Sequence, residues 1–198
     1  MKKLFLAFLA TFAMLFSQQV TAQGLEPSAM TVYRIENLSN GKYLSNGDKM
    51  DDDARIVFAD GNASSAGQEW ALYPTEMQDV VIFVNPTSGK ALDMAPGVGH
   101  PVQWNYEPAN PNQQFKLIEV GTGIYKLANN SNPYQYLAAA SNGYPMMSSS
   151  YSGNAIQYRF HDTGKRQALP PTPGKTFVIS NVANKEVFTA PEGSKSSS

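Results

Sequence analysis

The phrase Gly67-Gln68-Glu69-Trp70 is the strongest indication of the fold, because the chain repeats its pattern twice more. Related phrases follow at Asn112-Gln113-Gln114-Phe115 and at Ile156-Gln157-Tyr158-Arg159-Phe160. The rings at positions 70, 115 and 160 are spaced 45 residues apart both times. A fixed period of this length indicates an array of structural repeats. One large ring per repeat is expected to fill the centre of such a fold, so we assign Trp70, Phe115 and Phe160 to the core.

Each phrase follows a segment that predicts two short strands and a turn. Residues 32–44, 81–93 and 123–137 begin with β-branched and aromatic residues, pass through a polar turn and return to an apolar run. A leucine lies near the end of each segment, at position 44, 92 or 137. No stretch between them has the apolar spacing of a helix. Three repeats of about 45 residues therefore predict an all-β fold, a β-trefoil, over residues 31–162.

The first 22 residues are expected to be a signal peptide. Lys2 and Lys3 precede an uncharged apolar run, residues 4–16, and small residues follow up to Ala22. The run is shorter than the roughly 20 residues that a membrane-spanning helix needs, so no membrane span is expected in the mature chain. The sequence thus predicts a secreted protein, periplasmic or extracellular. The leader and the absence of cysteine favour a bacterial source.

The chain continues beyond the predicted trefoil. Residues 163–174 are rich in proline and predict an extended linker. Residues 175–198 then repeat part of the opening phrase, with Ile179 and Asn181 spaced as Ile35 and Asn37 are. We interpret them as a partial fourth repeat. Two interpretations stay open: the start of a second trefoil in a fused C-terminal domain, or a hairpin that docks on the first domain.

Composition and motifs exclude several classes of function. The chain has 15 basic and 16 acidic residues, a formal net charge of −1 that becomes −3 without Lys2 and Lys3, so no nucleic-acid surface is expected. There is no cysteine to form a disulfide or to act as a nucleophile. His100 and His161 lack metal-ligand spacing, and no nucleotide or nucleophile motif occurs. We therefore expect no catalytic residue, no metal and no cofactor.

The recurring phrase resembles the Q-x-W phrase of the ricin-type β-trefoil lectin domain, a carbohydrate-binding module. The match is intact at Gln68-Glu69-Trp70, has phenylalanine in place of tryptophan at Gln113-Gln114-Phe115, and is displaced by one residue in the third copy. The middle repeat also has Val102-Gln103-Trp104 at the family's distance from Asn112. The resemblance implies a glycan or polysaccharide partner. It also implies a role as the targeting module of a larger secreted enzyme.

The resemblance places a sugar site in the middle repeat. Binding a sugar calls for a carboxylate that accepts hydroxyl bonds, an amide that donates and accepts, and a ring that stacks on the C–H face. Carried over position by position, Asp93 is the acid, the amides come from Asn112 and Gln113, and Gln103 stands beside them. The predicted carbohydrate-binding residues are Asp93, Gln103, Trp104, Tyr106, Asn112 and Gln113.

The predicted site departs from the family at its ring. The usual position of the stacking ring holds Asn105, so the neighbouring Trp104 and Tyr106 are the candidates. At the acid position the first repeat has Ser45 and the third has Ala138. Two alternatives therefore stay open beside the lectin hypothesis. One is a protein-binding trefoil, such as a protease inhibitor, that uses its exposed loops. The other is a structural domain with degenerate sugar sites.

Overall fold

Six strands of the chain close into a barrel. The computed structural model describes residues 31–94 and 99–167. In the barrel each strand pairs antiparallel with the next, and the last pairs with the first. Closure leaves the barrel no exposed strand edge. The barrel strands are β1 (Thr31–Asn37), β4 (Trp70–Pro74), β5 (Val80–Val84), β8 (Gln114–Gly121), β9 (Ile124–Asn129) and β12 (Tyr158–Arg166).

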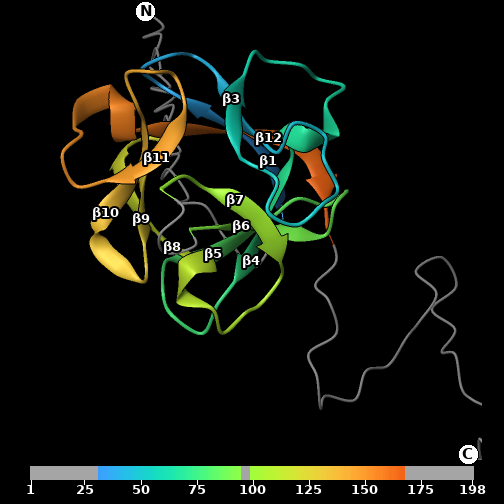
Figure 1. Ribbon diagram of the computed structural model, residues 1–198. Coiled ribbons are helices and arrows are strands. Elements are labelled where there is room, and N and C mark those ends of the chain that lie inside the picture. The colour runs from blue at the N-terminus through green and yellow to red at the C-terminus, as the bar shows by residue number, and fades with distance from the viewer. Residues whose placement is uncertain (1–30, 95–98, 168–198) are drawn as a thin grey trace, which may run out of the picture.

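Three hairpins cap one end of the barrel, one for each repeat. They lie around the centre of the view in Figure 1, with β3, β7 and β11 toward the viewer. Their strands are β2 (Tyr43–Ser45) with β3 (Val57–Ala59), β6 (Lys90–Asp93) with β7 (Val102–Asn105), and β10 (Asn132–Ala139) with β11 (Pro145–Ser148). A six-strand barrel with three capping hairpins confirms the predicted β-trefoil.

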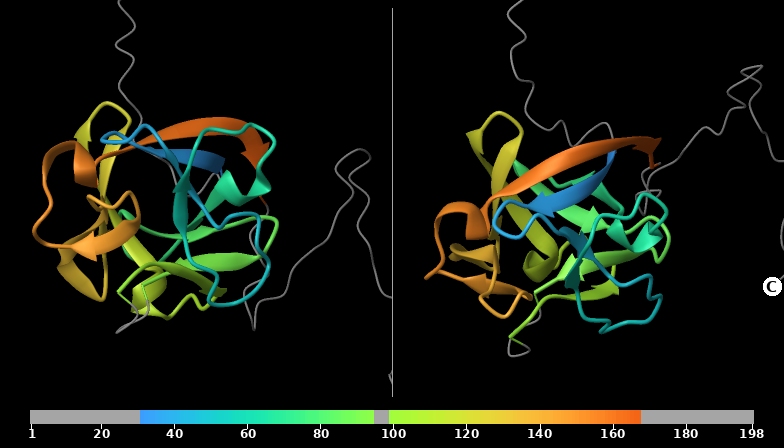
Figure 2. Two further views of the ribbon diagram at one scale, coloured as in Figure 1. Left: turned by 45° about the horizontal axis from the view of Figure 1, so that its top comes forward. Right: turned by 90° about the horizontal axis from the view of Figure 1, so that it is seen from above.

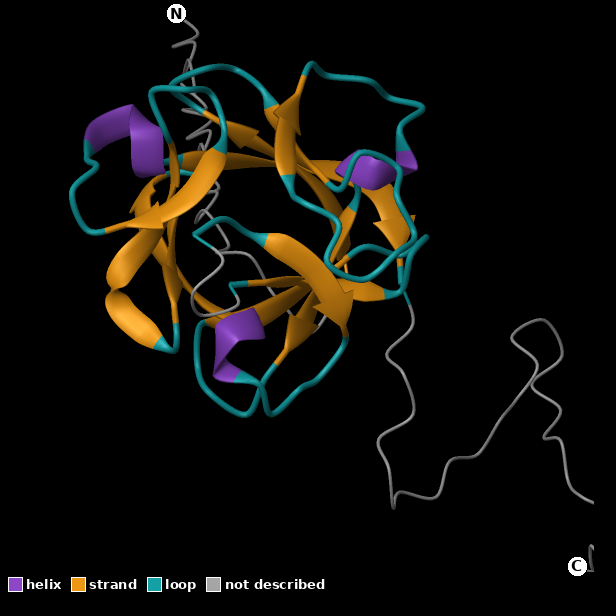
Figure 3. Cartoon of the chain, viewed as in Figure 1, coloured by secondary structure: helices purple, strands orange, loops and turns teal. Residues whose placement is uncertain are grey.

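A single 3-10 turn precedes the last barrel strand of each repeat. These turns are η2 (Ala66–Gln68), η3 (Pro111–Gln113) and η4 (Gly153–Ile156), and Figure 3 shows them at three corners of the molecule. Among the described residues, no helix has the length and apolar character needed to cross a membrane.

The recurring leucines and two of the three predicted rings fill the core. Leu44, Leu92 and Leu137 are fully buried, and so are Trp70 and Phe115. The Trp70 indole Nε1 also donates a hydrogen bond of 3.0 Å to the Leu44 carbonyl. A buried tryptophan needs such a partner for its N–H group, which fixes the ring against the capping hairpin of its own repeat.

In the third repeat, Tyr158 takes the place that we predicted for Phe160. Tyr158 is fully buried and lies opposite Asn37, just as Phe115 lies opposite Asn129. Phe160 is only partly buried and packs against the edge of the core. The prediction was wrong because the third repeat is two residues shorter here, so the equal spacing of 45 does not hold at the last ring.

Three equivalent asparagines join neighbouring repeats. The Asn85 side chain donates to the carbonyls of Ala66 and Glu69, at 2.8 and 2.9 Å, and accepts from the amides of Thr87 and Ser88. Each of the three holds its own turn and bonds the 3-10 turn of the preceding repeat, or of the last repeat in the case of Asn37. The set is Asn37, Asn85 and Asn129, all buried.

Asn85→Ala is expected to lower the free energy of unfolding by about 3 kcal/mol, because it leaves buried carbonyl and amide groups without partners. Chemical denaturation monitored by tryptophan fluorescence measures the loss. The matched control is Asn142→Ala, since Asn142 is exposed and accepts a single bond from the Tyr144 amide. A change at an exposed residue of this kind costs about 0.5 kcal/mol or less. Equal losses for the two variants would contradict the expectation.

The first and last strands run side by side and close the barrel, as both views in Figure 2 show. Thr31 pairs with Arg166, so β12 extends four residues into the stretch predicted as linker, residues 163–174. The pairing explains the difference, because β1 offers a partner along this length. The predicted signal peptide, the proline-rich part of the linker and the partial fourth repeat lie outside the described residues.

Candidate functional site

The middle repeat brings Asp93 and Gln113 together. Asp93 ends β6, and Gln113 ends the η3 turn that faces it. The Gln113 Nε2 donates to the Asp93 Oδ2 at 2.9 Å and to the Asn105 carbonyl at 2.8 Å. The Gln113 Oε1 accepts from the Glu107 amide at 2.8 Å. The glutamine therefore fixes the orientation of the carboxylate and joins it to the end of β7.

The side-chain amide of Asn112 lies beside this pair and is accessible to a ligand. The Asn112 backbone is held firmly, because its carbonyl accepts bonds from the Met94 amide and the Asn129 side chain, at 3.1 and 3.0 Å. Its side chain is partly exposed and makes no hydrogen bond among the described residues. An amide that is positioned by its backbone and has free donors and acceptors suits a polar ligand.

Two further polar residues, Asn110 and Glu107, belong to the site, and sequence reasoning missed both. The Asn110 Nδ2 bonds the Asp93 Oδ2 at 3.4 Å and the Glu107 Oε2 at 3.2 Å. The Asn110 Oδ1 accepts a hydrogen bond from the backbone N–H of Asn112 at 3.0 Å, which caps the η3 turn. An asparagine followed by Pro111 is a known turn-starting pattern and could have identified Asn110. No sequence signal placed Glu107 beside Asp93.

Of the two candidate rings, Trp104 is the more exposed. Trp104 lies opposite Ala91 and Asp93 lies opposite Val102, so both side chains are on the same face of the β6–β7 hairpin. The Trp104 side chain is 39% exposed. Tyr106 packs edge-on against Tyr73, with ring centroids 5.2 Å apart, and serves the outer core.

Gln103 has a structural role, contrary to its predicted place in the sugar site. It is fully buried, and its Nε2 donates to the carbonyls of Lys49 and Asp51, at 3.0 and 2.7 Å. Its Oε1 accepts from the side chains of Asn46 and Ser88. The Gln103 side chain therefore uses its hydrogen bonds to hold the β2–β3 loop of the first repeat and the β5–β6 turn against β7.

The surroundings of the Asp93 carboxyl disfavour its ionised form relative to an exposed carboxyl. Burial raises the pKa of Asp93 above its ordinary value of 3.8, the Gln113 hydrogen bond lowers it, and the charge of Glu107 raises it further. An ionised carboxylate in such a place costs folding free energy when no ligand is bound. Such a carboxylate is a candidate for contact with a ligand.

Asp93→Asn is expected to raise the thermal midpoint near pH 7 and to leave it unchanged near pH 3. Since the pKa is raised in the folded protein, the wild type loses stability as the pH rises from the ordinary pKa through the raised one. The asparagine removes this loss and still accepts the bond from Gln113. Differential scanning fluorimetry across this pH range measures the difference. A variant less stable than the wild type at neutral pH would contradict the expectation.

The first repeat fills the corresponding place with its own loop. The backbone N–H of Asn46 donates to the Gly67 carbonyl at 3.0 Å, just as the backbone N–H of Met94 donates to the Asn112 carbonyl. Gly67 therefore occupies the position that Asn112 has in the middle repeat. The Asp48 carboxylate accepts from the Gly67 amide at 2.6 Å and from the Ser65 hydroxyl. A side chain at Gly67 has no room, because its Cβ would lie 2.5 Å from the Asp48 amide.

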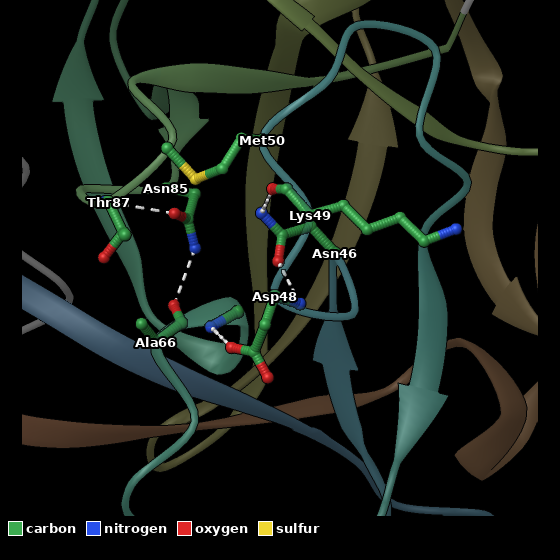
Figure 4. Close-up of a pocket in the computed structure, with 8 residues that line it drawn as sticks. Asn46, Asp48, Lys49, Met50, Ala66, Asn85 and Thr87 are labelled. Carbon is green, nitrogen blue, oxygen red and sulfur yellow. Dashed lines mark hydrogen bonds between the residues drawn. The ribbon is translucent and has the colours of Figure 1, made fainter.

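A small pocket lies between this loop, the η2 turn and the β5–β6 turn (Figure 4). The close-up shows that its polar groups bond one another: the Asp48 carboxylate lies on the η2 turn, and the Asn85 amide donates to Ala66. The first repeat therefore presents no free carboxylate–amide pair like that of Asp93 and Gln113.

The third repeat lacks both partners of the pair. Ala138 lies opposite Met146 as Asp93 lies opposite Val102, so it occupies the acid position. Ile156 lies two residues before the core ring Tyr158, where the middle repeat has Gln113 before Phe115, and it is buried. The carboxylate–amide pair is therefore found only in the middle repeat among the described residues.

Solved structures share this architecture. The designed threefold protein ThreeFoil matches with a TM-score of 0.60 and 24% identity, over 66% of this chain and 98% of that one. An exo-β-1,3-galactanase from Clostridium thermocellum matches with 0.58 and 24%, over 67% and 30%. SeviL, bound to the asialo-GM1 saccharide, matches with a TM-score of 0.53 and 15% identity, over 67% of this chain and 98% of that one. At these identities the likeness concerns the fold.

The chain spans less than a third of the length of the galactanase, so that enzyme contains a great deal that has no counterpart here. A search of curated protein sequences finds no match. A model of the ricin-type β-trefoil lectin domain-like family matches residues 17–99 and again residues 66–148. The two matches overlap at residues 66–99. Together the matches span more than half of the chain, and the chain belongs to the ricin-type β-trefoil lectin domain-like family.

Proposed function

We propose that the domain binds a glycan through a single site in the middle repeat and performs no chemistry of its own. The observation that carries this proposal is the buried Asp93 carboxylate, held by Gln113 at 2.9 Å with the open Asn112 amide beside it. Such a carboxylate accepts two sugar hydroxyls while the amide bonds a third. The family and the saccharide named with SeviL support a sugar as the ligand.

The proposed stacking ring is Trp104, in place of the family position that Asn105 occupies. It lies on the same face of the hairpin as Asp93, two residues along the strand pair. Side chains in this diagonal relation are about 7–8 Å apart, which leaves room for a sugar ring to contact both. Asn105 is unsuited to stacking, and its amide donates instead to the Asp52 carboxylate at 3.2 Å.

Trp104→Ala is expected to weaken glycan binding about 3- to 10-fold, because aromatic packing of this kind is worth about 0.5–1.5 kcal/mol. Trp104→Phe keeps a ring and should recover most of the affinity. Isothermal titration calorimetry with the best glycan measures both variants. Tyr106→Leu is the matched control, since Tyr106 packs against Tyr73. A larger loss in the control than in Trp104→Ala would contradict the assignment of the ring.

We also propose that the protein is exported and acts as a targeting module. The predicted leader supports export, and the galactanase provides a precedent for an enzyme that contains a domain of this fold. A single site binds weakly, and useful affinity then comes from several linked copies or from a fused domain.

A glycan array probed with the full chain tests the proposed function. Binding to a defined set of glycans supports it, and recovery of the intact glycans afterwards supports binding without hydrolysis. A folded sample that binds no glycan would contradict the proposal. Binding of the same sample to a protein partner through its exposed loops would then be the better account.

A further inference from the structure

The sugar site contains a second carboxylate. Asn110 donates one hydrogen of its Nδ2 toward Asp93 at 3.4 Å and the other toward Glu107 at 3.2 Å. Its Oδ1 accepts a hydrogen bond from the backbone N–H of Asn112, so the Nδ2 end of the side chain points toward the two acids. The Asp93 and Glu107 carboxylates therefore lie within two hydrogen-bond lengths of each other.

No cation among the described residues pairs with either carboxylate. The described ion pairs all lie elsewhere; Lys90, for example, bonds Asp52 at 2.6 Å and Asn105 at 3.1 Å. Within the described residues, the charge that raises the pKa of Asp93 is that of Glu107, which has the same sign. The side-chain amides of Asn110 and Gln113, which are neutral, donate the hydrogen bonds that the described part of the chain makes to the Asp93 carboxylate. The site therefore keeps a local excess of negative charge.

This charge excess discriminates between sugars by their own charge. An ammonium group placed beside two carboxylates forms charge-assisted hydrogen bonds, which are about twice as strong as those of a neutral hydroxyl. A carboxylate or sulfate on the ligand is repelled instead. Glu107 is exposed, so salt screens part of both effects.

We propose that this site prefers sugars that carry a free amino group, such as deacetylated hexosamines, over neutral sugars, and that it rejects acidic ones. The inference rests on the proposed function, because it specifies the ligand class of the same site. Asp93 holds the sugar through its hydroxyls, and Glu107 with Asp93 receives the ammonium group. N-acetylation removes the charge and with it the preference.

The test uses the full chain and two matched series of sugars. Galactose, galactosamine, N-acetylgalactosamine and galacturonic acid form one series, and the corresponding glucose derivatives form the other. Affinities from isothermal titration calorimetry at low salt are expected to favour the amine over the neutral sugar about tenfold, with the acid weakest. Adding about 0.5 M sodium chloride should reduce the difference, since screening shortens the reach of the charges.

Glu107→Gln is expected to lower the ratio of amine to neutral affinity several-fold. Glu76→Gln is the matched control, because it makes the same change of net charge at an exposed turn, and it should leave the ratio unchanged. Equal affinities for amine and neutral sugars, or a ratio that Glu107→Gln does not alter, would overturn the proposed preference and leave glycan binding standing. Failure of all the sugars to bind would overturn glycan binding itself.

Discussion

Replacing Asp93 by alanine is expected to weaken glycan binding about 100-fold or more. Each hydrogen bond to a charged group contributes about 1.5–3 kcal/mol, and two sugar hydroxyls are expected to bond this carboxylate. A loss of about 3 kcal/mol corresponds to roughly a hundredfold in affinity. The fold should persist, because Gln113 keeps its bonds to the Asn105 carbonyl and the Glu107 amide.

Ser45→Ala provides the matched control for Asp93→Ala. Ser45 holds the acid position in the first repeat, where its hydroxyl accepts a bond from the Gly47 amide. Its removal should leave glycan affinity unchanged, since Asp48 already fills the corresponding place. Calorimetry gives the affinities, and circular dichroism checks that both variants are folded. A folded Asp93→Ala protein that binds as tightly as the wild type would rule out the middle repeat as the site.

The fold could be predicted because a few residues recur at a nearly constant spacing along the chain, as the threefold symmetry requires. Leu44, Leu92 and Leu137 mark the capping hairpins, and all three are buried as expected. The third ring could not be predicted from spacing, because Tyr158 and Phe160 lie two residues apart on one strand and so face the same way. Pairing of Tyr158 with Asn37 decides between them, and that pairing exists only in the folded barrel.

The site could be predicted only where its residues stand at positions that the family resemblance supplied. Asp93 and Gln113 stand at such positions, and the structure places them in contact. Gln103 also comes from the family phrase, but its side chain bonds the long β2–β3 loop of the first repeat and Ser88. Contacts between loops of different repeats depend on tertiary packing. For the same reason the sequence did not indicate that Glu107 lies beside Asp93.

Tyr158→Ala is expected to lower the free energy of unfolding by about 3–5 kcal/mol, the range found when a buried aromatic ring is removed. The Tyr158 ring is fully buried and stacks on Phe58, with centroids 6.5 Å apart. Domains of this size have only about 5–15 kcal/mol of stability, so the variant should be close to unfolding at ordinary temperatures. Urea denaturation monitored by circular dichroism measures the change.

The comparison with Phe160→Leu tests the assignment of the core ring. The positions equivalent to Phe160 hold Leu72 and Leu117, two residues after Trp70 and Phe115, so a leucine there restores the pattern of the other repeats. Such a volume-compatible change should cost less than about 1.5 kcal/mol. If instead Phe160→Leu proved as damaging as Tyr158→Ala, Phe160 would be the central ring. The third repeat would then keep the spacing of the first two, and Ile156 would no longer stand in the place of Gln113.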